Sequence, residues 1–191
     1  MQENNRYSVS LAWQVILGIL FAFLNFAVNC LNKYNPFPLY MDTLFTVSAS
    51  FFGMTSGLIC AILYHFICTF INHYEISTLV WAVCSLTVVL IIRIYLLKRN
   101  KIGAIDILLL VFLVALSVSL EGAIIFTIMH ALTNYAEDSH VKFMYTLLSS
   151  NNIPVFISAL LPRVPVNILD KGICVSLGYL CYLGLIKFIK R

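Results

Sequence analysis

Polar and charged side chains that interrupt long apolar stretches are the residues of this sequence best suited to chemistry. Two segments hold most of them, residues 32–43 ("NKYNPFPLYMDT") and residues 163–172 ("RVPVNILDKG"). Such groups cost free energy in an apolar environment unless they pair with one another or bind a ligand. The sequence has no GxSxG or similar context for a catalytic nucleophile, so we expect binding and not catalysis.

The segment of residues 163–172 offers donors and acceptors in Arg163, Asn167, Asp170 and Lys171. Asn167, Asp170 and Lys171 are spaced i, i+3 and i+4, so they share one face if the segment is helical. Two interpretations stay open. Arg163, Asn167 and Lys171 contact a ligand, or the basic side chains only neutralise Asp170.

The segment of residues 32–43 holds five further candidate ligand contacts. They are Asn32, Tyr34, Asn35, Asp42 and Thr43. We interpret its first part, with two prolines, as a loop that gates an outward-facing pocket. Asp42 either contacts the ligand or caps the following helix, where both capping and the helix dipole favour a carboxylate.

Glu121 is a carboxylate in the middle of the apolar segment "LSVSLEGAIIFTIMHAL". His130 follows nine residues later, which on a helix places it on the opposite side from Glu121. Glu121 therefore either pairs with a group of another helix or contacts a ligand. We include Glu121, His130 and Asn134 among the candidate ligand contacts.

Metal binding, ATP hydrolysis and nucleic-acid binding have no support in the sequence. The histidines show no HxxxH or HExxH spacing, so we expect no metal site. The chain has no Walker sequence and would depend on a partner for ATP hydrolysis. We expect no cofactor, and the net charge of +4 indicates nothing about nucleic acid. The six scattered cysteines are interpreted as small packing residues.

The composition sets the environment in which these residues lie. Of 191 residues, 61% are hydrophobic and 10% are charged, and the mean hydropathy is +0.95. A soluble domain has about 25% charged residues, so this chain lacks the polar surface to face water on all sides. Several windows of about 18 apolar residues indicate an all-α integral membrane protein. We expect one membrane domain over residues 1–191.

Six hydrophobic segments predict a bundle of six transmembrane helices. They are about residues 8–31, the two parts of residues 41–71 that are separated at residues 53–57, and about residues 77–97, 105–132 and 169–189. The part before Gly53 is too short to cross ~30 Å of hydrocarbon upright, so residues 41–71 form either one kinked span or two helices. Residues 133–170 contain three prolines and are expected to form short helices and a lid, not one helix.

Basic residues predict the orientation of the bundle. Arg6, residues 98–101 and residues 187–191 fall on one side if there are six spans. The positive-inside rule makes that side cytoplasmic, with the N- and C-termini inside. We expect the apolar run after Arg6 to be retained as the first helix, since no small-residue cleavage site follows it. The predicted location is a bacterial plasma membrane.

Two stretches resemble the substrate-binding S components of energy-coupling factor (ECF) vitamin transporters. They are "PLYMDTLFTVSASFFGMTSGLICAILYHF" and "RVPVNILDKGICVSLGYLCYLG". The resemblance implies a non-enzymatic protein that binds a vitamin, a nucleobase or a related precursor from outside. The pocket would lie between the loop after the first helix and the outer halves of helices four to six. A transmembrane scaffold and two ABC-type ATPases would complete the importer.

The same resemblance implies docking onto the scaffold through small residues spaced four apart in the first helix. Gly18 and Ala22 are the nearest match and permit close helix approach. Metal-ion members of the family use an N-terminal histidine, whereas this chain begins "MQENN", which argues against nickel or cobalt. The alternatives are a membrane sensor domain of a signalling system, and an integral membrane enzyme that uses Glu121 with Arg163 and Lys171.

Overall fold

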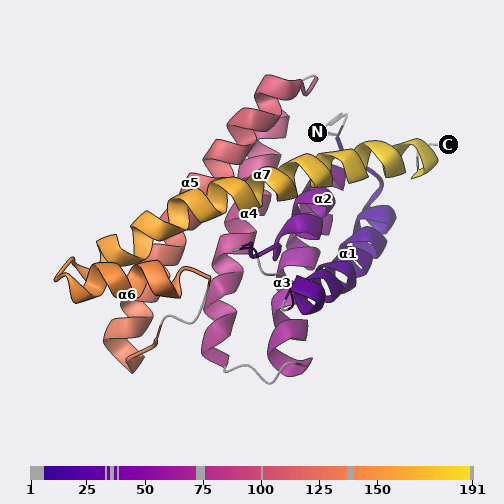
Figure 1. Cartoon of the computed structure of the whole chain (residues 1–191). Coiled ribbons are helices and arrows are strands. Elements are labelled where there is room, and N and C mark those ends of the chain that lie inside the picture. The colour runs from indigo at the N-terminus through magenta and orange to yellow at the C-terminus, as the bar shows by residue number, and fades with distance from the viewer. Residues whose placement is uncertain are drawn as a thin grey trace.

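The computed structural model describes residues 7–32, 34, 37, 39–71, 76–99, 101–136 and 140–189, with only the backbone of residues 76–78. This part of the chain is all-helical and contains no strand (Figure 1). The elements are α1 (Leu11–Asn32), α2 (Leu44–Phe52), α3 (Met54–Ile71), the 3-10 helix η1 (Ile76–Trp81), α4 (Ala82–Leu97), α5 (Ala104–Thr133), α6 (Lys142–Ser150) and α7 (Val155–Ile189).

Five helices of the described chain are long and apolar enough to cross a membrane. They are α1, α3, α4 with the end of η1, α5 and α7. α2 and α6 have nine residues each and are too short to do so. The chain is therefore an all-helical, multi-pass membrane protein, as its composition predicts. In place of the predicted second span, the residues before Gly53 form only the short helix α2.

The block of residues 41–71 forms two helices that are separated by Gly53. Gln14 of α1 lies at this break, where its Nε2 donates to the carbonyl of Val9 and its Oε1 accepts from the amide of Thr55. A Cβ on Gly53 would overlap the side-chain amide of Gln14, so a larger residue here would displace that amide from its bonds to Val9 and Thr55. The side chains of α2 from Thr46 to Phe52 are all buried, because α1, α3, α4 and α7 surround this helix.

α7 corrects the prediction for residues 133–170. Only α6 is a separate short helix, whereas α7 begins at Val155 and continues through Pro162 and Pro165 to Ile189 (Figure 1). Prolines are tolerated in membrane helices where neighbouring groups satisfy the freed backbone. Beside these prolines, the Arg163 side chain donates to the carbonyl of Ala159 over 2.8 Å, and Ser119 of α5 donates to the carbonyl of Arg163 over 3.3 Å, which ties α7 to α5 at this point.

Gly18 and Ala22 lie inside the chain's own helix contacts. Both are buried, and a Cβ on Gly18 would come within 2.9 Å of the Ile59 Cβ and of the Ser56 carbonyl oxygen. The small residue therefore serves the close approach of α1 to α3. This position does not present Gly18 or Ala22 to a second protein, so a docking surface on α1 would have to use the exposed face of the helix.

We expect Gly18→Ala to destabilise the protein by about 1–3 kcal/mol, because the added methyl overpacks against backbone that cannot yield. Gly184→Ala in α7 is the matched control, since nothing lies within 4 Å of its Cβ position. Alanine is the better helix former, so the control should keep or raise the melting temperature. Thermal unfolding of both variants in lipid nanodiscs measures the difference. Equal melting temperatures would contradict the assigned α1–α3 contact.

Candidate functional site

A lysine enclosed in the bundle is the centre of the candidate site. Lys171 of α7 is 1% exposed, and its ammonium donates to Asp42 Oδ1 over 2.8 Å, to Asp170 Oδ2 over 2.7 Å and to Thr43 Oγ1 over 3.0 Å. These bonds use all three N–H donors of the side chain. Together the four residues form the lysine cluster. A buried charge needs such partners because desolvation is costly.

Asp170 links the lysine cluster to the backbone of the α1–α2 connection. Its Oδ1 accepts a hydrogen bond from the amide of Met41 over 2.7 Å, while its Oδ2 pairs with Lys171. Asp170 is fully buried, whereas the side chain of Asp42 is 35% exposed. Asp42 is therefore the member of the cluster that a molecule arriving along the α1–α2 connection can reach.

The backbone that leads into α2 is held by asparagines of α1. Asn32 Nδ2 donates to the carbonyls of Leu39 and Tyr40 over 2.6 and 2.9 Å. Asn25 Nδ2 donates to the carbonyl of Asp42, and Asn25 Oδ1 accepts from the amide of Phe45 over 3.0 Å. Non-helical backbone inside an apolar bundle needs such partners for its polar groups. The side-chain amide of Asn32 therefore holds the backbone of this connection in place.

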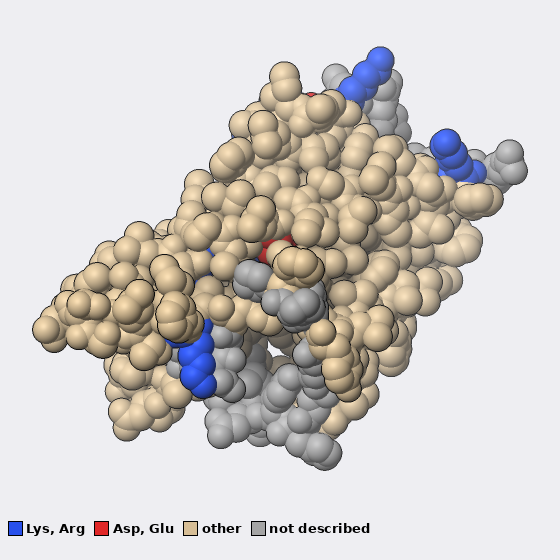
Figure 2. Space-filling view, in the orientation of Figure 1, with Lys and Arg blue, Asp and Glu red and all other residues tan. Residues whose placement is uncertain are grey.

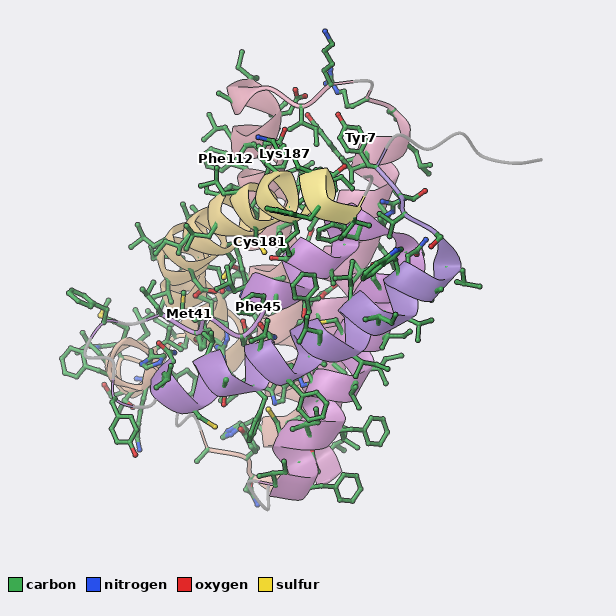
Figure 3. The ribbon with its side chains drawn as sticks, turned by 90° about the vertical axis from the view of Figure 1, so that its right-hand side faces the viewer. Tyr7, Met41, Phe45, Phe112, Cys181 and Lys187 are labelled. Atoms are coloured by element: carbon green, nitrogen blue, oxygen red, sulfur yellow. The ribbon has the colours of Figure 1, made fainter. Side chains whose placement is uncertain are left out.

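Figure 3 shows the labelled Met41 and Phe45 where this connection enters the bundle, between the ribbons of α1 and α7. Met41 adopts a positive φ of 52°, which turns the chain into α2. The N-cap of α2 is Thr43, and no side-chain capping bond is formed there. The alternative in which Asp42 caps the helix is therefore not observed, because its carboxylate is paired with Lys171 instead.

Arg163, Asn167 and Lys171 are four residues apart and form a polar row along α7. They are 5%, 3% and 1% exposed. Asn167 Nδ2 donates to Ser119 Oγ of α5 over 2.9 Å, and the Arg163 guanidinium lies 5.2 Å from the Phe126 ring centroid. The segment is thus helical, as the shared face of Asn167 and Lys171 requires, and its polar side chains face the bundle.

Glu121 lies on α5 opposite α4. Its Oε1 accepts from Thr87 Oγ1 over 2.7 Å, and the Cys84 thiol is close to the same carboxylate. Its Oε2 is buried and has no hydrogen-bond partner among the described residues. A buried oxygen of this kind is unusual, since the large majority of buried polar atoms are paired.

The remaining candidates are spread over the outer part of the chain. His130 Nδ1 contacts the carbonyl of Tyr135 at 2.9 Å, and its ring stacks on Phe126, so it does not act with Glu121. Asn134 is exposed and ends α5 with a φ of 53°, and Tyr34 is 88% exposed. Asn35 lies outside the described residues. The structure therefore gathers Asp42, Thr43, Asn167 and Lys171, but it does not bring Tyr34 or Asn134 to them.

Several polar residues of the interior were missing from the sequence-based candidates. They are Asn25, Thr87 and Ser119, and the pair of His65 Nε2 with Ser85 Oγ at 2.9 Å between α3 and α4. Each is a polar side chain within an apolar segment, which is the only indication in the sequence. No group of three or more potential metal ligands occurs in the described chain.

Acidic and basic side chains are unevenly visible on the molecular surface. Figure 2 shows acidic atoms recessed near the middle of the viewed face, and basic side chains that project at its upper end and at its lower left. The upper end also carries both termini in Figure 1.

Comparisons with protein-family models, with curated proteins and with solved structures give no match. The fold and the lysine cluster are consequently the basis for any functional proposal.

We expect Lys171→Met to destabilise the protein by about 3–5 kcal/mol, because it leaves two carboxylates facing each other without their cation. Arg99→Met is the control, since the Arg99 side chain is 49% exposed and its ion pair with Asp106 at 3.3 Å contributes about 0–1 kcal/mol. Adding Asp42→Asn and Asp170→Asn to Lys171→Met should recover part of the loss. Thermal unfolding in nanodiscs provides the comparison. If the triple variant is no more stable than Lys171→Met, the loss of stability does not come from the repulsion between the two carboxylates.

Proposed function

We propose that this chain is the substrate-binding component of an ECF-type importer in a bacterial plasma membrane. It binds a vitamin, a nucleobase or a related precursor from outside and releases it inward with a separate transmembrane scaffold and two ABC-type ATPases. The observation that carries the proposal is the lysine cluster, whose single partly exposed member, Asp42, lies at the end of the α1–α2 connection. Ionisable groups kept inside a membrane bundle mark ligand pathways by default.

The shape of the α1–α2 connection supports a binding site. A stretch of non-helical backbone leads to the N-terminus of the buried helix α2, and polar side chains of α1 and α7 satisfy that backbone. Broken helices of this kind form substrate sites in membrane transporters, because they bring backbone groups and a helix end into the bundle.

The same connection supports six crossings with both termini on the inner side. The non-helical stretch and α2 together would form the second crossing, in addition to the five long helices. An even number of crossings agrees with the contact of Tyr7 with Tyr182, whose ring centroids are 6.1 Å apart, and Figure 3 shows Tyr7 and Lys187 at one end. Lys98 and Arg99 follow α4, and Lys187 lies in the last turn of α7, at the same end of the bundle (Figure 1). Basic residues of this kind favour a cytoplasmic location for that end.

Docking onto the scaffold would use the exposed face of α1. Gly18 and Ala22 are occupied by contacts within the chain, whereas Trp13, Ile16 and Leu20 are 43%, 54% and 49% exposed. These side chains are available to lipid or to a helix of a partner. The chain has no Walker sequence, so inward release would depend on ATPases supplied by other chains.

Ligand identification tests the proposal. The purified protein in nanodiscs is analysed by mass spectrometry for co-purifying small molecules, and its melting temperature is measured against a panel of vitamins and nucleobases. We expect one panel member to raise the melting temperature, and Asp42→Asn to weaken its binding about tenfold or more, because a charge-assisted hydrogen bond is lost. Asp106→Asn, in the ion pair with the half-exposed Arg99, is the control and should bind normally.

The outcome against the proposal is equally concrete. No co-purifying molecule, no stabilising panel member and no ABC-type ATPase bound to the tagged protein would together overturn the importer function. Binding without any ATPase partner would instead favour the membrane sensor.

A further inference from the structure

We propose that α6 is an interfacial helix, which lies along the membrane surface and inserts Phe143, Met144 and Leu147 among the lipid acyl chains. The partner of this surface is the bilayer itself, at the end of the bundle away from both termini. The inference goes beyond the proposed transport function, since it depends only on the chain being a multi-pass membrane protein.

One side of α6 packs on the protein. Val141, directly before the helix, is 2% exposed, and the Tyr145 ring lies edge-on to Phe126 of α5, with the ring centroids 4.9 Å apart. Val141 and Tyr145 are four residues apart, so they lie on the same side of the helix. The inner side of α6 is therefore occupied by contacts within the chain.

The outward surface of α6 is divided into an apolar and a polar side. The apolar side carries Phe143, Met144 and Leu147, which are 76%, 47% and 48% exposed. The polar side carries Lys142 and Thr146, which are exposed as well. On the surface of a soluble protein, the outward side of a helix is charged or polar. An outward surface that is apolar on one side and polar on the other is typical of a helix between hydrocarbon and water.

The chain on both sides of α6 keeps this helix at the surface of the membrane. Residues 134–136 and 151–154 are non-helical, and most of their side chains are exposed. Irregular backbone that faces lipid does not occur within the hydrocarbon region, so these residues need water or headgroups around them. The nine residues of α6 are also too few to cross the membrane. The helix can therefore lie along the membrane surface but not deep inside it.

The neighbour of α6 is a helix that faces lipid. α6 packs against α7, and the first turns of α7 leave Ile157 and Leu161 39% and 53% exposed. Figure 1 shows α6 beside these turns, at the end of the bundle away from both termini. α7 is long and apolar enough to cross the membrane, so lipid surrounds the exposed side chains of its first turns. The apolar side of α6 extends this lipid-facing surface to the membrane boundary.

Lipid fits the apolar side of α6 better than a second protein does. A stable protein interface buries about 800 Å² on each partner. The apolar side of α6 consists of only three side chains on a nine-residue helix. Lipid chains require no such area, because each side chain that leaves water for hydrocarbon lowers the free energy separately.

Spin labels measure the environment on each side of α6. The variants are Met144→Cys, Leu147→Cys and Thr146→Cys, each labelled in a background with Cys30→Ser and Cys181→Ser, since the other four cysteines are buried. The labelled protein is placed in phosphatidylcholine nanodiscs, and EPR measures the accessibility of each label to oxygen and to a water-soluble nickel chelate. Leu147 and Thr146 are the matched pair, because both are exposed and they lie about 100° apart on the helix.

We expect the ratio of oxygen to nickel accessibility to be about threefold or more higher for labels at Leu147→Cys and Met144→Cys than at Thr146→Cys, because oxygen concentrates in the acyl region that the apolar side enters. All three variants should keep the melting temperature of the background, since the replaced side chains are exposed. Similar ratios at the three positions overturn the inference, because the apolar side then faces water. Low accessibility to both reagents on the apolar side also overturns it, because a second copy or another protein then covers α6.

Discussion

The desolvation of the Lys171 ammonium is the constraint on which the rest of the structure depends. An ammonium that is 1% exposed in an apolar bundle requires acceptors on all sides. Asp170 is its neighbour on α7, but Asp42 and Thr43 come from the connection between α1 and α2. The lysine therefore fixes where this connection enters the bundle, and with it the start of α2.

The position of α2 has consequences for the backbone around it. Because α2 begins inside the bundle, the described backbone just before it lies outside any helix, and its polar groups are bonded by side chains of α1 and α7. Asn25, Asn32 and Asp170 supply the partners for this backbone. These three polar side chains therefore have a structural role in the bundle. Glu121 differs from all of them, because one of its buried oxygens has no partner among the described residues.

Hydropathy was sufficient to predict the long helices, because a span of apolar residues in a membrane has no alternative to helical hydrogen bonding. It failed at α7, where Pro162 and Pro165 predicted an interruption. A proline removes one helical donor, but α7 packs along α5 and is bonded to it through Ser119, and such tertiary contacts are not encoded in periodicity. Gly18 shows the same limit, since its spacing with Ala22 indicates close helix approach without saying to which helix.

The sequence by itself determined the environment, the all-helical class and the residues that are costly to bury, because these follow from composition and from local hydrogen bonding. It also placed Asn167 and Lys171 on one helical face. Tertiary structure decided which of those costly groups neutralise each other. Asp42 and Lys171 are 129 residues apart in the chain, and only the packing of α7 beside the α1–α2 connection brings them to 2.8 Å. The same packing leaves Glu121 Oε2 without a partner in the described chain, because the basic side chains of α7 are engaged elsewhere.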